Sequence, residues 1–191
     1  MDELSDEELL GLYKRGRTEA FDLLYERHAD GLFFFLWRMC ASRPLAEELL
    51  HDVLFKVARG AQQYDARGRF RPWLYRVASN HCLNVLASAP HRRDAQVVPL
   101  SALPSLEPAA AALDGPEAVA EARETRAEVL AAIGALEPRY RAAMVLRELV
   151  GLPIDEIAQA LEVPVGTVKT LLFRGRERLR RRLSGLAAEV A

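Results

Sequence analysis

The chain has 191 residues, of which 50% are hydrophobic and 28% are charged, and its formal net charge is −1. This composition predicts a globular protein and argues against a uniformly basic nucleic-acid binder. The charge is unevenly distributed, because residues 1–30 carry −5, residues 53–76 carry +5 and residues 169–182 carry +6. Two basic patches in a near-neutral chain are typical of a protein that meets a polyanion on some faces and a protein partner on others.

Helical periodicity dominates the N-terminal half. Apolar residues recur at helical spacing and no segment alternates over the length of a strand, which predicts an all-α fold. Ser5 and Glu8 have the spacing of a capping box and predict a helix that ends near Lys14. Thr18 is positioned to cap the next helix, whose apolar stripe runs to Met39.

Two further helices are expected before residue 88. Pro44 fits the first turn of a helix that continues to about Arg59. Gly68 interrupts the pattern, and Pro72 with Trp73 starts a fourth helix. His28 lies on an apolar face and is expected to be a core residue with a satisfied ring.

The segment 88–117 contains five of the ten prolines, loses helical periodicity and predicts a flexible linker. The sequence thus predicts two small helical domains, 1–87 and 118–186, joined by this linker and followed by a tail at 187–191. Apolar periodicity resumes in the second domain over the segments Val119 to Leu136, Tyr140 to Val150 and Ile154 to Leu161.

The run from Ile154 to Leu171 fits a helix-turn-helix, with small Ala158 where the two helices cross. A second helix from about Pro164 has an inward stripe of Val168, Leu172, Gly175, Leu179 and Leu183. Off that stripe lie Lys169, Thr170, Phe173, Arg174 and Arg176. In such a motif the second helix enters the major groove by its first turns, where Lys and Arg meet phosphates or guanine.

The run RELVGLPIDEIAQALEVPVGTVKTLLFRGRERLRRRL resembles the −35-binding region 4 of bacterial sigma factors of the extracytoplasmic-function (ECF) type, in the sigma-70 family. The resemblance implies DNA contacts at Arg147, Lys169, Thr170, Phe173, Arg174 and Arg176. Three residues depart from the family pattern. Pro153 replaces a usual Ser, Leu171 replaces a frequent Arg, and Glu162 stands where Gly is common, so a left-handed backbone there would cost ~1 kcal/mol.

The segment EELLHDVLF, residues 47–55, resembles the helix by which region 2 of these factors binds the β′ subunit of RNA polymerase. The resemblance implies core-polymerase contacts from Glu48, His51, Asp52 and Phe55. These residues are three or four positions apart, so they can share one helix face. His51 replaces the usual Gln and Asp52 the usual Glu.

The segment YDARGRFRPWLYRVASN, residues 64–80, interleaves basic and aromatic side chains, as opening a DNA duplex requires. It resembles the promoter-melting part of region 2, with the loop from Gln62 to Arg69 capturing a flipped base. The resemblance implies −10 recognition and melting by Tyr64, Arg69, Phe70, Arg71, Trp73, Arg76 and Asn80. Trp73, Leu74 and Val77 fit a buried helix face equally well.

The resemblance therefore implies a non-catalytic specificity subunit that binds core polymerase, reads the −35 and −10 elements and helps to melt the DNA. The linker would let both domains engage at once, and each domain alone would bind promoter DNA poorly. No cofactor is expected. The acidic N-terminus and exposed apolar residues such as Leu171 suggest an inhibitory anti-sigma partner.

Other functions remain open at this point. One alternative is a helix-turn-helix regulator that binds DNA without polymerase, and another is a polymerase-binding adaptor that reads no promoter. The four histidines and two cysteines lack metal-ligand spacing, so neither a metal site nor an enzyme is expected. The acidic start and the short apolar run from Gly31 to Trp37 predict a cytoplasmic protein without membrane insertion.

Overall fold

The structure is a computed structural model that describes residues 3–64, 69–88 and 128–189. Its named helices, in chain order, are α1 (Asp6–Lys14), α2 (Glu19–Cys40), α3 (Arg43–Gly60), η1 (Ala61–Gln63), α4 (Phe70–Ser88), α6 (Pro138–Met144), η3 (Val145–Leu149), α7 (Ile154–Leu161) and α8 (Val165–Glu189). Residues 128–134 are also helical, and no strand occurs within the described ranges. The all-α prediction is confirmed. The predicted linker, apart from Ser88, lies outside the described residues.

The N-terminal helices begin largely as their capping residues predict. The Ser5 hydroxyl accepts the Glu8 N–H at 3.3 Å, and the Glu8 carboxylate accepts the Ser5 N–H at 2.7 Å, which completes the capping box. The Ser42 hydroxyl accepts the Leu45 N–H at 3.5 Å and opens α3, with Pro44 in its first turn. The prediction that Thr18 caps α2 is wrong, because its backbone is already helical and its side chain makes no capping bond.

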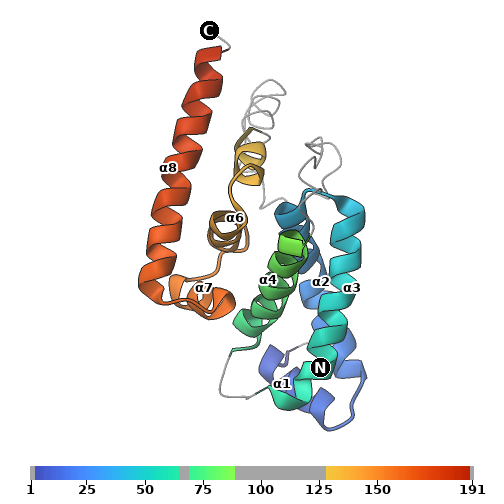
Figure 1. Cartoon of the computed structure of the whole chain (residues 1–191). Helices are drawn as coiled ribbons and strands as arrows, with labels where there is room; N and C mark the ends of the chain where they lie inside the picture. Colours follow the sequence, from blue (N-terminus) through green and yellow to red (C-terminus); the bar gives the residue numbers. More distant parts are fainter. Residues whose placement is uncertain (1–2, 65–68, 89–127, 190–191) are drawn as a thin grey trace, which may run out of the picture.

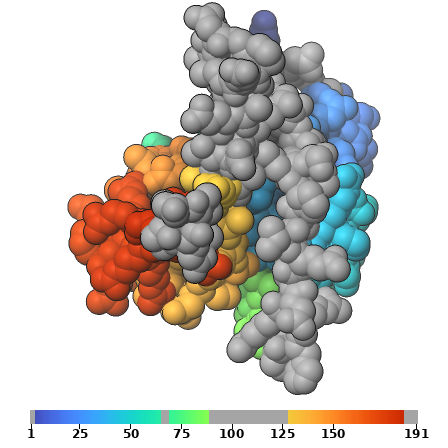
Figure 2. All heavy atoms as spheres, turned by 90° about the horizontal axis from the view of Figure 1, so that it is seen from above, coloured from blue at the N-terminus to red at the C-terminus, as the bar shows by residue number. Residues whose placement is uncertain are grey.

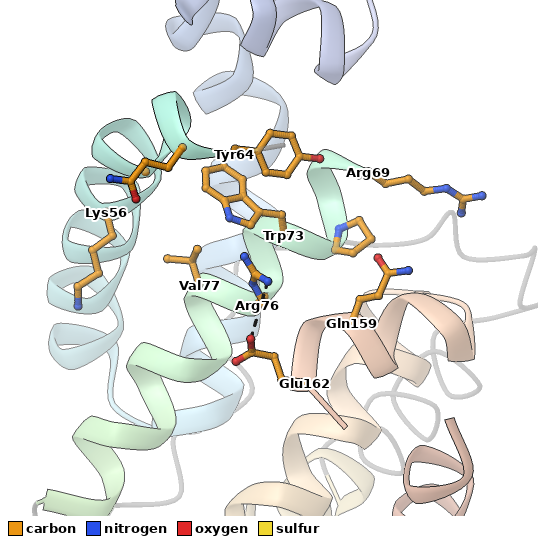
Figure 3. A pocket seen from close by; sticks show the side chains of 11 residues that line it. Lys56, Tyr64, Arg69, Trp73, Arg76, Val77, Gln159 and Glu162 are labelled. Carbon is orange, nitrogen blue, oxygen red and sulfur yellow. Dashed lines mark ion pairs between the residues drawn. The ribbon is translucent and has the colours of Figure 1, made fainter. Parts of the chain in front are cut away.

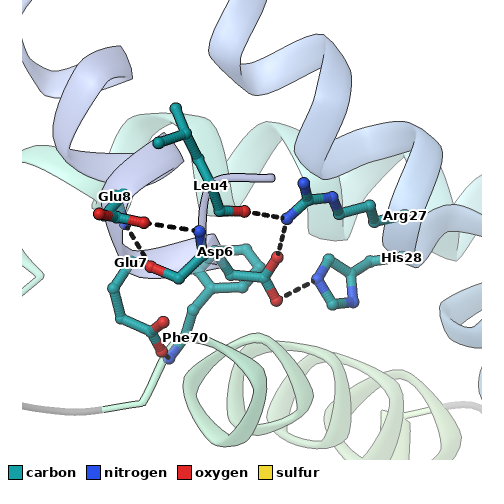
Figure 4. Close-up of polar contacts among 8 residues, drawn as sticks. Leu4, Asp6, Glu7, Glu8, Arg27, His28 and Phe70 are labelled. Carbon is teal, nitrogen blue, oxygen red and sulfur yellow. Dashed lines mark hydrogen bonds and ion pairs between the residues drawn. The ribbon is translucent and has the colours of Figure 1, made fainter. Parts of the chain in front are cut away.

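Helix α4 begins at Phe70, two residues before the predicted start at Pro72. A proline at the third helical position is tolerated because the first N–H groups of a helix have no intrahelical partner. One of these N–H groups receives a partner from α1: the Glu7 carboxylate accepts the Phe70 N–H at 2.9 Å (Figure 4). Helix α1 thus supplies the cap of α4 across 63 residues of sequence.

A second polar contact ties α1 to α2 through Asp6 (Figure 4). Its carboxylate lies 2.6 Å from the His28 Nε2 atom and 3.1 Å from the Arg27 Nη1 atom. The hydrogen bond from His28 is the main cause that holds the pKa of Asp6 below its ordinary value, although burial opposes it. His28 is mostly buried and its ring lies 5.3 Å from that of Phe70, so the expected satisfied core histidine is confirmed.

This contact should make stability depend on pH. Because the pKa of Asp6 is lowered in the folded state, its contribution is present above the unfolded value near 3.8 and is lost as the pH falls through the folded value. At neutral pH, Asp6→Asn should lower the free energy of unfolding by about 1 kcal/mol. Urea denaturation at pH 6.5 and pH 2.5 should show this difference shrinking in acid. The exposed control Asp30→Asn should show neither effect, and a pH-independent loss for Asp6→Asn would contradict the assignment.

The C-terminal half contains the predicted helix-turn-helix. Helix α7 has the predicted bounds, while the segment expected from Tyr140 to Val150 divides into α6 and the π-helical turn η3. Glu162 ends α7 with φ 52°, which confirms the left-handed backbone. Pro153 sits at the N-cap position of α7 and provides no capping side chain.

Helix α8 packs against the rest of the core through its predicted apolar stripe. Val168, Leu172, Gly175 and Leu179 are buried, and Leu183 is half-buried. A Cβ atom on Gly175 would lie 3.0 Å from the Met144 Cγ atom, so α6 and α8 approach closely because this position carries no side chain. The stripe holds the opposite face of α8 toward solvent.

The two halves of the chain pack against each other. Figure 1 places α4 and α6 between α3 on one side and α8 on the other, with α7 beside the lower end of α8, and Figure 2 shows the red C-terminal and blue-to-cyan N-terminal parts on opposite sides from above. Helix α4 packs on α7, and η3 and α6 contact α2. Their buried apolar side chains form one continuous cluster. The Arg141 guanidinium of α6 donates to the Met39 carbonyl near the end of α2, and burial lowers the pKa of Arg141.

Candidate functional site

The four residues predicted to bind polymerase lie on the exposed side of α3. Glu48, His51, Asp52 and Phe55 all face solvent, and the Phe55 ring is 63% exposed. The opposite face of the helix is buried and holds Leu45, Ala46, Leu49, Val53 and Val57. This division follows from the helical period, which separates polar and apolar positions on α3. An exposed phenylalanine beside carboxylates is a chemically suitable surface for a partner helix.

One polar contact fixes Asp52 on that surface. The His81 Nε2 atom of α4 lies 2.9 Å from the Asp52 carboxylate, and its Nδ1 atom lies 2.5 Å from the Lys56 ammonium. Since the ammonium can only donate, Nδ1 accepts and the Nε2–H donates to Asp52. His81 thereby orients one predicted contact residue from the neighbouring helix.

The aromatic residues predicted to act on melted DNA lie mainly in the core, an arrangement that the sequence already allowed for Trp73. Phe70 is 2% exposed, and Tyr64 and Trp73 are each 9% exposed. The Trp73 ring lies 4.6 Å from the Tyr64 ring and 5.9 Å from the Phe70 ring, measured between centroids. These contacts enclose Phe70 completely. Tyr64 and Trp73 keep a small exposed area, and both line a cleft.

That cleft has a volume of about 720 Å³ and lies between α3, α4 and α7 (Figure 3). Its walls combine the two aromatic edges with three cationic side chains. Gln159 and Glu162 of α7 form its opposite wall. The cationic residues that line it are Lys56, Arg69 and Arg76.

Arg69, Arg71 and Asn80 of the predicted −10 surface are exposed and Arg76 is half-buried, but all four are bonded to the C-terminal half. The Arg69 guanidinium lies 2.5 Å from the Glu156 carboxylate, whose hydrogen bond raises the pKa of Arg69. Arg71 donates to the Val150 carbonyl at 2.6 Å. The Asn80 amide donates to the Glu162 carboxylate at 2.7 Å, and Arg76 lies 3.8 Å from that same carboxylate.

The residues predicted to read duplex DNA project from the first turns of α8. Lys169, Thr170, Phe173, Arg174 and Arg176 are exposed, and the Phe173 ring is 70% exposed. Lys169 and Arg174 have no ion pair with another described residue. Arg176 pairs with Glu148 at 2.7 Å, and the Thr170 hydroxyl donates to the Gly166 carbonyl at 3.0 Å. The face is therefore basic and carries one large apolar ring.

Two residues of the C-terminal half differ from expectation. Arg147 is half-buried and its guanidinium donates to the Leu152 carbonyl at 3.0 Å, so it fixes the turn before α7. Leu171, expected to be exposed to a partner, is half-buried and packs against the core. Exposed apolar residues among the described side chains of α8 are Val165 and Phe173 instead.

Sequence reasoning missed the contacts by which three residues join the halves of the chain: Glu156, Glu162 and Arg141. Only Glu162 gave a signal, because it stands in a turn where glycine is favoured. Within the described residues no cluster of ligating side chains could hold a metal ion. None of the helices in the described ranges has the length and apolar character needed to cross a membrane.

Comparison with known proteins gives the same two regions. Residues 24–92 match the family model for sigma-70 region 2, and residues 126–179 match the model for sigma-70, region 4. The chain is 32% identical to the RNA polymerase sigma factor CarQ of Myxococcus xanthus over 94% of this chain and 98% of CarQ. It is 30% identical to the ECF RNA polymerase sigma-E factor of Escherichia coli strain K12 over 92% of this chain and 93% of that factor. It is 32% identical to the longer ECF RNA polymerase sigma factor SigE of Mycolicibacterium smegmatis, over 90% of this chain and 65% of SigE.

Two solved structures share the fold. CnrH, solved in complex with the cytosolic domain of CnrY, aligns with a TM-score of 0.69 over 94% of this chain and 97% of CnrH, at 20% identity. The sigma factor RpoE of Bartonella quintana, solved with the anti-sigma factor NepR, aligns with a TM-score of 0.63 over 86% of this chain and 96% of RpoE, at 19% identity.

Proposed function

The chain belongs to the ECF group of the sigma-70 family, and on that basis we propose how its function is divided among three surfaces. As a sigma factor it binds RNA polymerase core and directs promoter-specific initiation. The proposal assigns core docking to α3, −10 recognition and melting to α4 with the residues before it, and −35 recognition to the first turns of α8. The observation that carries it is the exposure of α3 and α8 residues opposite their buried stripes, at the positions that the family resemblance indicates.

Core docking is assigned to Glu48, His51, Asp52 and Phe55. The exposed ring of Phe55 can insert between side chains of a partner helix, and the carboxylates beside it can pair with cations there. A ring that is 63% exposed contributes little to the fold. Its replacement should therefore report on binding.

Phe55→Ala should weaken the affinity for core polymerase about tenfold, the loss typical of a contact at the centre of an interface. The measurement is a fluorescence titration of labelled protein with core enzyme from the source organism. Tyr25→Ala is the matched control, because Tyr25 is an aromatic residue of α2 that is 46% exposed. Equal affinities for Phe55→Ala and wild type, or equal losses in both variants, would contradict docking through α3.

The −10 function is assigned to Arg69, Arg71, Arg76 and Asn80, with the edges of Tyr64 and Trp73 in the cleft between them. Cations can hold the backbone of an opened strand, and an aromatic edge at the cleft can meet an unstacked base. Phe70 serves this surface as a support, since its ring is enclosed beneath Trp73.

The −35 function is assigned to Lys169, Thr170, Phe173, Arg174 and Arg176 on α8. Arg147 acts through the turn that it fixes before α7. Residues 1–87 and 118–186 are the proposed domain limits. The segment 88–117 is the proposed tether that joins the two binding events, and residues 187–191 are the tail.

The protein is proposed to act without catalysis of its own, in the cytoplasm, where RNA polymerase forms the bonds. The structural relatives also support an inhibitory partner, because RpoE was solved with the anti-sigma factor NepR. Exposed rings on both halves of this chain, Phe55 and Phe173, offer apolar anchors for such a partner. Purification from the source organism without a bound inhibitor, together with constitutive promoter activity, would contradict this part of the proposal.

A further inference from the structure

The most strained position in the interface between the two halves is Glu162. Its φ of 52° and ψ of 45° lie in the left-handed region, which is unfavourable for residues other than glycine, asparagine and aspartate. A glycine would end α7 without this strain. Strained residues persist where other interactions hold them, so the contacts of the Glu162 side chain indicate what it does there.

Those contacts all reach across to α4. The Glu162 carboxylate accepts the Asn80 amide at 2.7 Å through one oxygen, and its other oxygen lies 3.8 Å from the Arg76 guanidinium (Figure 3). One and a half helical turns earlier, Glu156 of α7 is 8% exposed and accepts the Arg69 guanidinium at 2.5 Å. Two carboxylates, one in α7 and one at its C-cap, therefore accept hydrogen bonds from Arg69 and Asn80 and form an ion pair with Arg76 on the other half.

The residues that these carboxylates contact are the ones to which we assign binding of the −10 strand. A carboxylate presents two anionic oxygens to a guanidinium, as a phosphate does, and both make charge-assisted hydrogen bonds. Two more bonds hold α7 and its neighbours in place: Arg71 donates to the Val150 carbonyl, and Arg141 donates to the Met39 carbonyl. The contact surfaces of α3 and α8 stay exposed in the same arrangement.

We propose that region 4 of the free protein closes over the −10 surface of region 2, with Glu156 and Glu162 in the places of DNA phosphates. Single-stranded DNA and α7 then compete for Arg69, Arg76 and Asn80, so the open form is the one that binds the strand. The surfaces for core polymerase and the −35 duplex remain available in the closed form. This inference rests on the proposed function, because it concerns the regulation of the same −10 surface.

The test uses the full chain and the double variant Glu156→Gln/Glu162→Gly. The glycine relieves the left-handed strain, so this variant should fold, as circular dichroism can verify. The matched control is Glu137→Gln/Glu177→Gln, which changes the net charge equally. Those carboxylates pair with Arg178 and Arg181 within region 4, and neither has a hydrogen bond or ion pair with a described residue of α4.

Two quantities are measured for wild type, opened variant and control: the radius of gyration by small-angle X-ray scattering, and the affinity for a fluorescein-labelled, mixed-sequence 20-nucleotide single strand by anisotropy. The opened variant should have a larger radius and bind about tenfold tighter, since each lost ion pair shifts an equilibrium by up to roughly fivefold. The control should match wild type in radius and stay within about twofold in affinity.

An unchanged radius or an unchanged affinity in the opened variant would overturn the proposal, as would an equal gain in the control, which would indicate a general charge effect. Failure of the proposed function has a different signature. In that case the wild-type chain would neither bind core polymerase nor support promoter-specific transcription, whatever its radius of gyration.

Discussion

Phe70→Ala is expected to lower the free energy of unfolding by about 3–5 kcal/mol, the range for truncating a buried aromatic residue. Phe70 is 2% exposed, and its ring lies between His28 and Trp73 at the start of α4. Its removal would leave a cavity where α1, α2 and α4 meet, and those helices are already fixed there and cannot close the space. The effect should appear in urea denaturation followed by circular dichroism, as a lower midpoint with little change in slope.

An exposed aromatic residue provides the control for this prediction. Tyr25 is 46% exposed, so Tyr25→Ala should change the stability by no more than about 0.5 kcal/mol. The family resemblance implies a role for Phe70 in promoter melting, and a ring that acted on melted DNA alone would give the opposite result. Unchanged stability of Phe70→Ala, together with lost promoter opening, would contradict the assignment of this ring to the core.

Arg174→Ala is expected to reduce transcription from a −35-dependent promoter about tenfold to a hundredfold, the discrimination that one bidentate contact to guanine provides. Arg174 is exposed on the first turns of α8 and has no ion pair with another described residue. Its guanidinium group is therefore available to donate to a base edge or a phosphate. Core binding should be unaffected, because the contact lies on the other half of the chain from α3.

Two further variants separate recognition from simple charge. Arg174→Lys keeps the charge but loses the planar fork, so it should recover little of the activity. Arg182→Ala removes a charge near the far end of α8, and it should weaken binding slightly and equally for all sequences. If Arg174→Ala behaves like Arg182→Ala, or if Arg174→Lys restores full activity, specific readout by Arg174 is wrong.

Much of the fold could be predicted from local patterns. The Ser5–Glu8 capping box, the bounds of α7 and the left-handed Glu162 all depend on residues close in sequence, where spacing and backbone preference decide the outcome. Thr18 shows the limit of that reasoning. A suitable residue type before an apolar stripe predicts a cap, but the backbone at Thr18 is already helical.

The burial of the aromatic residues at the start of α4 had a signal in the sequence. Phe70, Trp73 and Val77 are spaced by three and four residues, which is the period of a buried helix face. Their alternation with arginines favoured a DNA-binding interpretation of the same positions. Burial decides between the two, and burial depends on α1, α2 and α3, which the segment itself does not specify.

The contact between α4 and α7 had no sequence signal. Asn80 and Glu162 are separated by 82 residues, and neither belongs to a sequence motif that predicts a contact with the other. Such pairings arise when two separately amphipathic units bring their remaining surfaces together. The unusual glutamate at the end of α7 marked a position of interest, but its partner could be found only in three dimensions.

The most direct test of the central claim is in-vitro transcription with core polymerase from the source organism on fragmented genomic DNA, with and without this protein. The 5′ ends of the RNA are mapped. A sigma factor predicts discrete new start sites that share sequences near −35 and −10 and that disappear with Asn80→Ala or Arg174→Ala. Core polymerase that binds this protein yet gives no new starts would contradict its role in promoter recognition, and absence of core binding would contradict the account as a whole.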